Sequence, residues 1–430
     1  MKRLLMCACA VLAVAGRAEP VQAADQLERV VILMRHGVRS AMASPEDLGR
    51  STARPWPAFD VPPGHLTAKG ARLVTLMGHY YRDIYTEAGL LSGDDCDSVY
   101  YWANLTQRTE RTAAALAEGL TPGCAVTIHQ ADQGPDPLFD APLAGVGPVD
   151  PARVRAAILG RVGGDLAAWD RRQAQNLATL EALLLQCGGD GCQAQEIPPG
   201  VRRLSETPIV DGLGDADHLV ALNSPAIATG GLMESLLMGY AQGLDFESLG
   251  WTGLDAPSLT RAFAVHAASI DLRTRTPEVG RQTSSHLAAR LLATLQHGAA
   301  RATVADPLGG EARLIVLAGH DGTLTMLAGL LGLDWLLPSY GPNQAAPGGG
   351  LVFELWRGEA DTPYVRVRYI AQGLDQLRWA TPLSPDHPPE IASIFPAGCR
   401  ETTAGQDCTL DGFADLVTER IDPRFVRTGD

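Results

Sequence analysis

The residues best suited to do chemistry lie in three short segments, each at the end of an apolar run. In residues 30–40, VVILMRHGVRS, the apolar run leads directly into Arg35, His36, Gly37 and Arg39. A planar guanidinium group forms paired, charge-assisted hydrogen bonds with phosphate oxygens. A neutral imidazole is a nucleophile, and adjacent guanidinium charges disfavour its protonation. This segment therefore indicates an anion site beside a reactive histidine.

The other two segments repeat the pattern. Arg108 comes shortly after SVYYWAN, and His320 and Asp321 come directly after RLIVLAG. Because open α/β sheets bind ligands beyond the carboxyl ends of their strands, we expect all three segments to meet there. Together they would supply three arginines that hold a phosphoryl group as its charge redistributes. For Arg108 alone, an exposed position on a helix is the alternative.

Such a site predicts phosphomonoester hydrolysis in two steps, without a metal ion. His36 would attack phosphorus and carry it as a covalent phosphohistidine. Gly37 would let the backbone approach closely, since it has no Cβ. Asp321, at the start of the helical GTLTMLAGLLGL segment, would protonate the leaving oxygen once bound phosphate raises its pKa.

The N-terminus has the pattern of a secretory signal peptide over residues 1–23. Lys2 and Arg3 precede an apolar core at residues 4–15, and Val21-Gln22-Ala23 offers a small-residue cleavage site. This core is too short to span a bilayer. We therefore expect a periplasmic or secreted protein with no membrane anchor.

The charge of the chain narrows the class of partner. Its formal net charge is −14, and removal of residues 1–23, which carry three cations and one anion, makes it −16. An acidic surface argues against nucleic acid as the main partner and favours a small phosphomonoester substrate. The chain contains no CxxC or HExxH motif, so we expect neither a metal ion nor another cofactor. The sequence does not indicate an oligomeric state.

The cysteines predict disulfides in an oxidising compartment. Six remain after the signal segment, and six cysteines allow 15 connectivities. Their positions form three local pairs, which we expect to be Cys96–Cys124, Cys187–Cys192 and Cys399–Cys408. Free buried thiols are the alternative.

The hydrophobic pattern predicts an α/β domain interrupted by a helical segment. Apolar, β-branched runs indicate strands at 29–34, 98–103, 313–318, 350–356 and 364–370. Helical patterns cover 67–90 (from a Thr67 cap), 106–120, 150–185, 223–243, 257–273 and 277–297, and strands are expected to resume only at 313. We assign residues 24–130 and 300–430 to an α/β catalytic domain and residues 131–299 to a mostly α-helical cap domain. Loops 51–65 and 341–350 are expected to border a cleft.

Several motifs resemble those of the histidine acid phosphatases, in the branch that contains bacterial periplasmic phytases and glucose-1-phosphatases. The resemblance covers the mature chain and is carried by RHGVRS, LTAKG, ANLTQRTERT, RTPEV, GHDG, PGGGLVFELW and AGCRETTAGQDC. It implies a large α/β domain around one mixed sheet with an inserted helical cap, a phosphoglycerate-mutase-like arrangement.

The resemblance also implies roles for individual residues. It makes His36 the phosphorylated nucleophile and Asp321 the proton donor. The residues that hold phosphate would be Arg35, Arg39, Arg108 and His320. Glu234 and His266 match residues that line the substrate pocket in phytases; the alternatives are a solvated helix charge for Glu234 and a satisfied core residue for His266.

The specificity residues depart from the phytase pattern. Residues 40–43, Ser-Ala-Met-Ala, lack the proline and lysine of the enteric phytases. Asn104 is typical of the sugar phosphatases. The pocket arginine expected after RTPEV falls on Thr283, which leaves Arg281 as a substitute.

The leading hypothesis is an exported acid phosphatase that acts on phytate, on sugar phosphates or on both, and we favour a broad range that includes phytate. One alternative is a glucose-1-phosphatase-type enzyme without useful phytase activity. Another is a non-catalytic periplasmic protein that binds phosphate or sugar phosphate, although binding alone needs neither a neutral nucleophile nor Asp321. A mutase of the related cytoplasmic branch conflicts with the signal segment and the cysteines.

Overall fold

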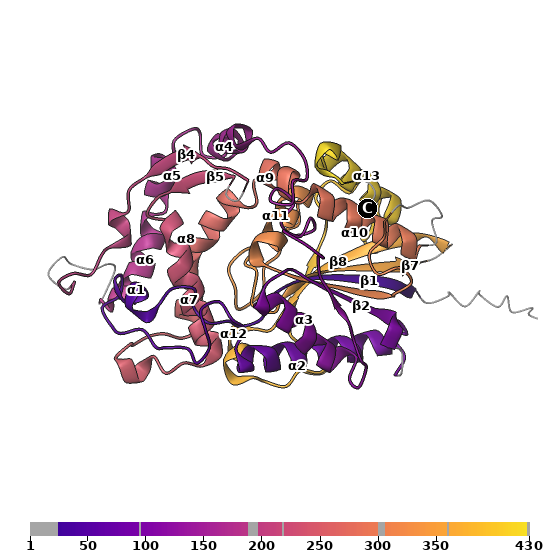
Figure 1. Cartoon of the computed structure of the whole chain (residues 1–430), viewed down its shortest axis with the longest axis horizontal. Coiled ribbons are helices and arrows are strands. Elements are labelled where there is room, and N and C mark those ends of the chain that lie inside the picture. Colours follow the sequence, from indigo (N-terminus) through magenta and orange to yellow (C-terminus); the bar gives the residue numbers. More distant parts are fainter. Residues whose placement is uncertain are drawn as a thin grey trace, which may run out of the picture.

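The central feature of the fold is one mixed sheet (Figure 1). The computed structural model describes residues 25–93, 96–187, 197–216, 219–299, 306–358 and 361–427. The strands of the sheet are β1 (Gln26–Arg35), β2 (Val99–Ala103), β3 (Ile128–His129), β6 (Leu314–Gly319), β7 (Gly350–Arg357), β8 (Pro363–Ala371), β9 (Glu390–Ile394) and β10 (Cys408–Thr409). Their order is β10-β8-β7-β1-β6-β2-β3, and β9 also pairs with β8.

The parallel half of the sheet brings three strand ends to one edge. β1 and β2 both pair in parallel with β6, while β7 runs antiparallel on the other side of β1. In this register Arg35 lies opposite Gly319, and Ala103 lies opposite Ala318. The residues that follow these strands therefore emerge side by side, as the sequence predicts.

Helices cover both faces of the sheet. Along β1, Val30, Ile32 and Met34 pack on the side of α2 (Ala68–Glu87) and α3 (Gln107–Leu120). Val31 and Leu33 pack on the opposite side, which is covered by α10 (Ser285–Gly298), α11 (Asp321–Leu331) and α13 (Leu410–Arg420). Because β1 is buried on both faces, it reads as a continuous apolar run rather than an alternating one.

The mostly helical segment lies beside the sheet, at the left of Figure 1. Its elements are α4 (Pro151–Gly160), α5 (Leu166–Arg172), α6 (Ala174–Leu185), α7 (Gly230–Gln242), α8 (Ala256–Arg273), α9 (Pro277–Thr283) and the hairpin β4 (Val210–Leu213) and β5 (Val220–Asn223). Two α-helices from the flanking segments are α1 (Pro45–Gly49) and α12 (Leu374–Trp379). The 3-10 helices are η1 (Cys96–Ser98), η3 (Leu204–Glu206), η4 (Ile227–Thr229), η5 (Glu247–Leu249) and η7 (Pro423–Phe425).

Most of the predicted elements are present, with boundaries shifted by a few residues. The five predicted strands correspond to β1, β2, β6, β7 and β8, and Thr67 caps α2 by accepting a hydrogen bond from the Gly70 amide at 2.8 Å. The expectation of no strand between β2 and residue 313 is wrong, because β3 and the β4–β5 hairpin form there. The single helical stretch predicted at 150–185 is divided into three helices. Gly163 and Gly164, which adopt positive φ, separate α4 from α5, and Gln173 separates α5 from α6. The proposed domain boundaries remain a prediction. At the end of the proposed cap, α9 contacts α11, and α10 contacts both α11 and β1.

Two of the three expected disulfides are present. Cys96–Cys124 and Cys399–Cys408 are bonded, with Cα atoms 5.6 and 6.0 Å apart. The expected Cys187–Cys192 pair is not described, because Cys192 lies outside the described residues. The expected signal segment, residues 1–23, also lies outside them. No described helix has the length and apolar character needed to cross a membrane. Within the same residues, no group of three or more histidine, cysteine or acidic side chains is placed to hold a metal ion.

Candidate active site

The three predicted segments meet at the carboxyl edge of the parallel strands. The His36 amide donates to the Gly319 carbonyl at 2.9 Å, which ties the end of β1 to the end of β6. The imidazole rings of His36 and His320 are 5.6 Å apart and lie edge to face. Arg108, in the first turn of α3, reaches the same place, with Nη2 3.4 Å from Nδ1 of His320. The exposed-helix alternative for Arg108 is therefore wrong.

Hydrogen bonding fixes which nitrogen of His36 is free. Nδ1 lies 2.9 Å from the Gly37 carbonyl oxygen, and a carbonyl only accepts, so Nδ1 carries a proton. In the neutral ring this leaves Nε2 with its lone pair. Burial lowers the pKa of His36 well below its usual value, and the charges of Arg35 and Arg39 lower it further. The geometry gives a neutral imidazole with a defined nucleophilic nitrogen.

Two glycines let helix α2 approach the segment that follows β1. A Cβ on Gly70, in the first turn of α2, would lie 2.0 Å from the Val38 carbonyl oxygen. A Cβ on Gly37 would lie 2.7 Å from Cγ2 of Val74, and the Gly37 amide donates to Thr112 at 3.0 Å. Neither approach leaves room for a side chain, so both glycines help to position the segment that carries His36.

Arg35 is the most buried of the three arginines, with 1% of its surface exposed. One Nη atom donates to the Ala345 carbonyl at 2.6 Å, and the other pairs with Glu234 and lies 3.6 Å from Asp321. Burial alone would lower the pKa of Arg35, but these two carboxylates outweigh it and raise the pKa. A buried cation paired in this way is held in one geometry before any substrate arrives.

Asp321 and His320 open helix α11, at its positive end. Burial and the Arg108 charge lower the pKa of His320 to about 4. For Asp321 burial would raise the pKa, but Arg35, His36 and His320 outweigh burial and hold it below the usual value. Asp321 is thus ionised before substrate binds, and it can hold a proton only when a bound anion offsets the charge of Arg35.

Glu234 and His266 bring the helical segment into the same site. Glu234, on α7, is 9% exposed and pairs with Arg35, so its alternative as a solvated surface charge is wrong. Nε2 of His266, on α8, lies 3.5 Å from Oε1 of Glu234. Burial would raise the pKa of Glu234, but Arg35 and His266 together lower it. Arg39 is buried, and its charge interacts with those of Glu234, Arg35 and Asp321, so all eight predicted site residues lie in one cluster.

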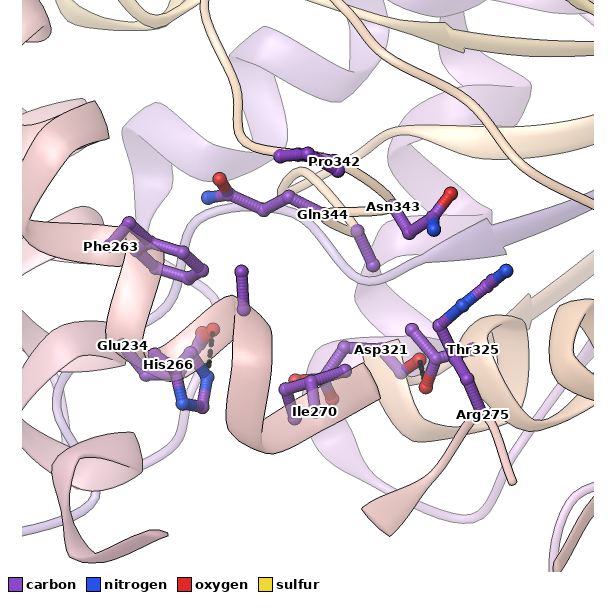
Figure 2. A pocket seen from close by; sticks show the side chains of 12 residues that line it. Glu234, Phe263, His266, Ile270, Arg275, Asp321, Thr325, Pro342, Asn343 and Gln344 are labelled. Carbon is purple, nitrogen blue, oxygen red and sulfur yellow. Dashed lines mark hydrogen bonds and ion pairs between the residues drawn. The ribbon is translucent and has the colours of Figure 1, made fainter. Parts of the chain in front are cut away.

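A pocket next to this cluster extends along α8 (Figure 2). Its cavity volume is about 20 Å³, and Glu234, His266 and Asp321 line one part of it. The sequence analysis missed several of its residues, namely Phe263, Ile270, Arg275, Thr325, Asn343 and Gln344. The helical spacing of Phe263 and Ile270 from His266 was a usable signal, since residues three or four apart share a helix face. The predicted cleft loop 341–350 supplies Asn343 and Gln344.

The structure places three of the residues at which the sequence departs from the phytase pattern. Thr283 donates to the Val279 carbonyl at 2.9 Å within α9, and Arg281 pairs with Glu278 at 3.1 Å, so neither lines the pocket. The Asn104 side-chain amide donates to Asp140 at 3.0 Å, directly after β2. Arg281 therefore does not substitute for a pocket arginine.

Comparison with known proteins identifies the family. The model of the histidine phosphatase superfamily, branch 2, matches residues 26–197 and 233–370. The chain belongs to this family. It is therefore a phosphatase with a mixed α/β fold, as the three segments predict.

Individual relatives agree with this assignment. The chain is 34% identical to phytase AppA of Escherichia coli over 92% of both chains. It is 26% identical to a glucose-1-phosphatase of Salmonella typhimurium, over 94% of this chain and 95% of the relative. Among solved structures, Hafnia alvei phytase in complex with tartrate superposes with a TM-score of 0.83 at 30% identity, covering 95% of this chain and 100% of that one.

Proposed function

We propose that this protein is an exported acid phosphatase that hydrolyses small phosphomonoesters through a phosphohistidine on His36. The observation that carries the proposal is the bond from Nδ1 of His36 to the Gly37 carbonyl, which leaves Nε2 unprotonated among three arginines. Arg35, Arg39 and Arg108 would hold the phosphoryl oxygens, with His320 beside them.

In the first step, the lone pair on Nε2 of His36 attacks phosphorus. The P–O bond to the leaving group breaks, and the leaving oxygen takes its electron pair together with a proton from Asp321. The imidazole then carries phosphorus on Nε2 and a proton on Nδ1, and the Gly37 carbonyl accepts the hydrogen bond from that proton. In the second step, water attacks phosphorus, its proton passes to Asp321, and the N–P electron pair returns to Nε2.

The proton on Asp321 arrives with the substrate. A phosphomonoester has a second pKa of about 6, so below that pH it carries one proton. The bound anion offsets the charge of Arg35, which otherwise holds Asp321 ionised. The proton then moves to the carboxylate, and this supports activity on the acidic side of neutrality.

Phytate and sugar phosphates are the substrates we propose. The names of the relatives support both, since one is a phytase and another a glucose-1-phosphatase. Glu234 and His266, which match phytase pocket residues, line the pocket. The alternative is a sugar phosphatase without useful phytase activity, and the Asn104–Asp140 hydrogen bond is the feature that favours it.

The decisive experiment is to trap the phosphoenzyme. Purified protein is mixed with a ³²P-labelled phosphomonoester near pH 5, quenched in alkali, and digested for mass spectrometry. We expect one acid-labile phosphate on His36 and no label or turnover in His36→Ala. Turnover that survives in His36→Ala would contradict the mechanism, whereas tight phosphate binding without turnover would support a binding protein instead. Sequencing the N-terminus of protein recovered from the periplasm tests export, with cleavage expected after Ala23.

A further inference from the structure

The segment that follows Arg39 is fixed against the first of the two predicted cleft loops. The Ser40 amide donates to the His65 carbonyl at 2.9 Å. In the opposite direction, the Gly64 amide donates to the Ala41 carbonyl at 3.3 Å. These bonds fix the position of the side chain that comes next in the segment.

That side chain is Met42, and its thioether lies beside Arg108. A Cβ on Gly64, which is buried and has a φ of +74°, would lie 2.7 Å from Sδ of Met42 and 3.7 Å from Nη1 of Arg108. The two side chains therefore approach the same point, and glycine at this position leaves room for both. The Leu66 amide donates to the Gln107 side chain at 2.9 Å, which ties the loop to the first turn of α3, where Arg108 lies.

Met42 is exposed although its neighbours are not. Its exposed fraction is 58%, whereas Ala41 is buried and Ala43 is half-buried against the core. Single exposed apolar side chains are common on protein surfaces, so exposure alone does not indicate a function. What distinguishes Met42 is its position beside an arginine of the phosphate site. A thioether is flexible and polarisable, and it contacts aromatic rings favourably.

The direction of the leaving group brings it toward Met42. His36 is 2% exposed, so its ring attacks from the buried side of the site. In phosphoryl transfer the attacking and leaving atoms lie roughly in line. The leaving group therefore points away from His36 and toward solvent, where the exposed Met42 lies next to Arg108.

We propose that Met42 is a specificity-determining residue that contacts the leaving group and favours aromatic ones. The proposal rests on the proposed function, since the phosphate must first occupy the site around His36. A thioether carries no charge and donates no hydrogen bond to the hydroxyl groups of a sugar or polyol. Within the broad range of phosphomonoesters, Met42 therefore favours those whose alcohol carries an aromatic ring.

The test compares 2-phenylethyl phosphate with ethyl phosphate. Both are esters of primary alcohols, so their leaving oxygens need similar protonation and the substrates differ mainly in the ring. We expect native enzyme to have the higher kcat/KM for 2-phenylethyl phosphate. Met42→Gln should lower this preference about twofold to tenfold, mainly through KM, as for one lost contact between a thioether and an aromatic ring. Met42→Leu should keep most of the preference, because it keeps the apolar surface.

The matched control is Leu213→Gln. Leu213 is 61% exposed, close to the value for Met42, but it lies on the β4–β5 hairpin, away from α3 (Figure 1). This variant should keep the native values for both substrates.

Oxidation gives a second test on the native protein. Hydrogen peroxide transfers one oxygen atom to the sulfur of Met42, which becomes a polar sulfoxide while the peroxide is reduced to water. Mild treatment should lower the preference of native enzyme as Met42→Gln does, and it should leave the preference of Met42→Leu unchanged.

The remaining outcomes separate the proposal from its alternatives. An unchanged preference in Met42→Gln, or native enzyme that does not prefer 2-phenylethyl phosphate, would overturn the proposal. Equal losses on both substrates in Met42→Gln would also overturn it, because Met42 would then only support the loop beside Arg108. No turnover of either substrate by native enzyme would instead contradict the proposed function.

Discussion

Replacement of Asp321 by asparagine separates two effects of one carboxylate. Asparagine has nearly the same shape but neither donates a carboxylic proton nor carries charge. If Asp321 is the proton donor, the variant loses assistance to the leaving oxygen. It also loses an anion that lies 3.6 Å from Arg35 and competes with phosphate for it.

The two effects have different sizes and opposite signs. General acid catalysis contributes about 10²–10⁴-fold, so turnover of alkyl phosphates such as glycerol 2-phosphate should fall by that range. p-Nitrophenolate leaves without protonation, and its turnover should fall less than about tenfold. Two unit charges 3.6 Å apart interact by about 5 kcal/mol at an effective dielectric constant of about 20. Because the Asp321 side chain is 34% exposed, water screens most of this, and we expect about 1 kcal/mol, or about fivefold tighter binding of inorganic phosphate.

The assay measures kcat and KM on both substrates, and competitive inhibition by phosphate, for native enzyme and Asp321→Asn. Asp411→Asn is the matched control, because Asp411 is also an acidic residue in the first turn of a helix on the same face of the sheet. It should leave all the constants unchanged.

Equal losses of kcat on the alkyl and aryl substrates would refute Asp321 as the acid. Weaker inhibition by phosphate in Asp321→Asn would refute the electrostatic part of the reasoning. The two conclusions are independent, since one rests on a ratio of rates and the other on an inhibition constant.

Three further predictions concern pH, charge pairing and covalent stability. Arg39→Gln removes a cation that lowers the pKa of His36, so this pKa should rise. Because only neutral His36 can attack, the fall of kcat/KM at acidic pH should then begin at a higher pH than in native enzyme. Glu234→Gln removes the anion paired with Arg35, so denaturant unfolding should show a loss of about 1–3 kcal/mol, and added phosphate should stabilise this variant more than native protein. Replacing both cysteines of Cys96–Cys124 by serine opens a loop with a sequence separation of 28 and should cost about 3–4 kcal/mol, read from the shift in unfolding midpoint. The first prediction is contradicted if the pH profile of Arg39→Gln does not shift, and the second if Glu234→Gln is as stable as native protein. The third is contradicted if the cysteine variant loses less than about 1 kcal/mol of stability.

The part of the site that lies at strand ends was predictable from the sequence because sheet geometry is regular. Parallel strands place their carboxyl ends at one edge, so Arg35, His36, His320 and Asp321 had to meet once β1 and β6 were identified. Glu234 and His266 carry no such local signal. They were found through the resemblance to a family, since a charge or histidine on a helix is compatible with a surface or core position.

What the sequence did not indicate depends on packing between distant segments. Asn343 and Gln344 come from a loop whose position is fixed by contacts with Trp335, and the side chain of Arg275 is directed by Asp334. The β4–β5 hairpin was missed because its strands are four residues long. In a mostly helical segment, runs that short do not reveal a period.

The pairing of Arg35 also explains why the proton would go to Asp321 rather than to Glu234. A buried guanidinium without an anion is costly, so both carboxylates stabilise the site before substrate binds. When a phosphate anion joins them, the combined negative charge favours uptake of one proton. Glu234 bonds directly to Arg35 and its side chain is 12% exposed, whereas Asp321 lies 3.6 Å away and is 34% exposed. Because Asp321 is the more exposed carboxylate and does not bond directly to Arg35, it is the one placed to exchange a proton with bound substrate, so the stabilisation of the site and the choice of acid follow from the same geometry.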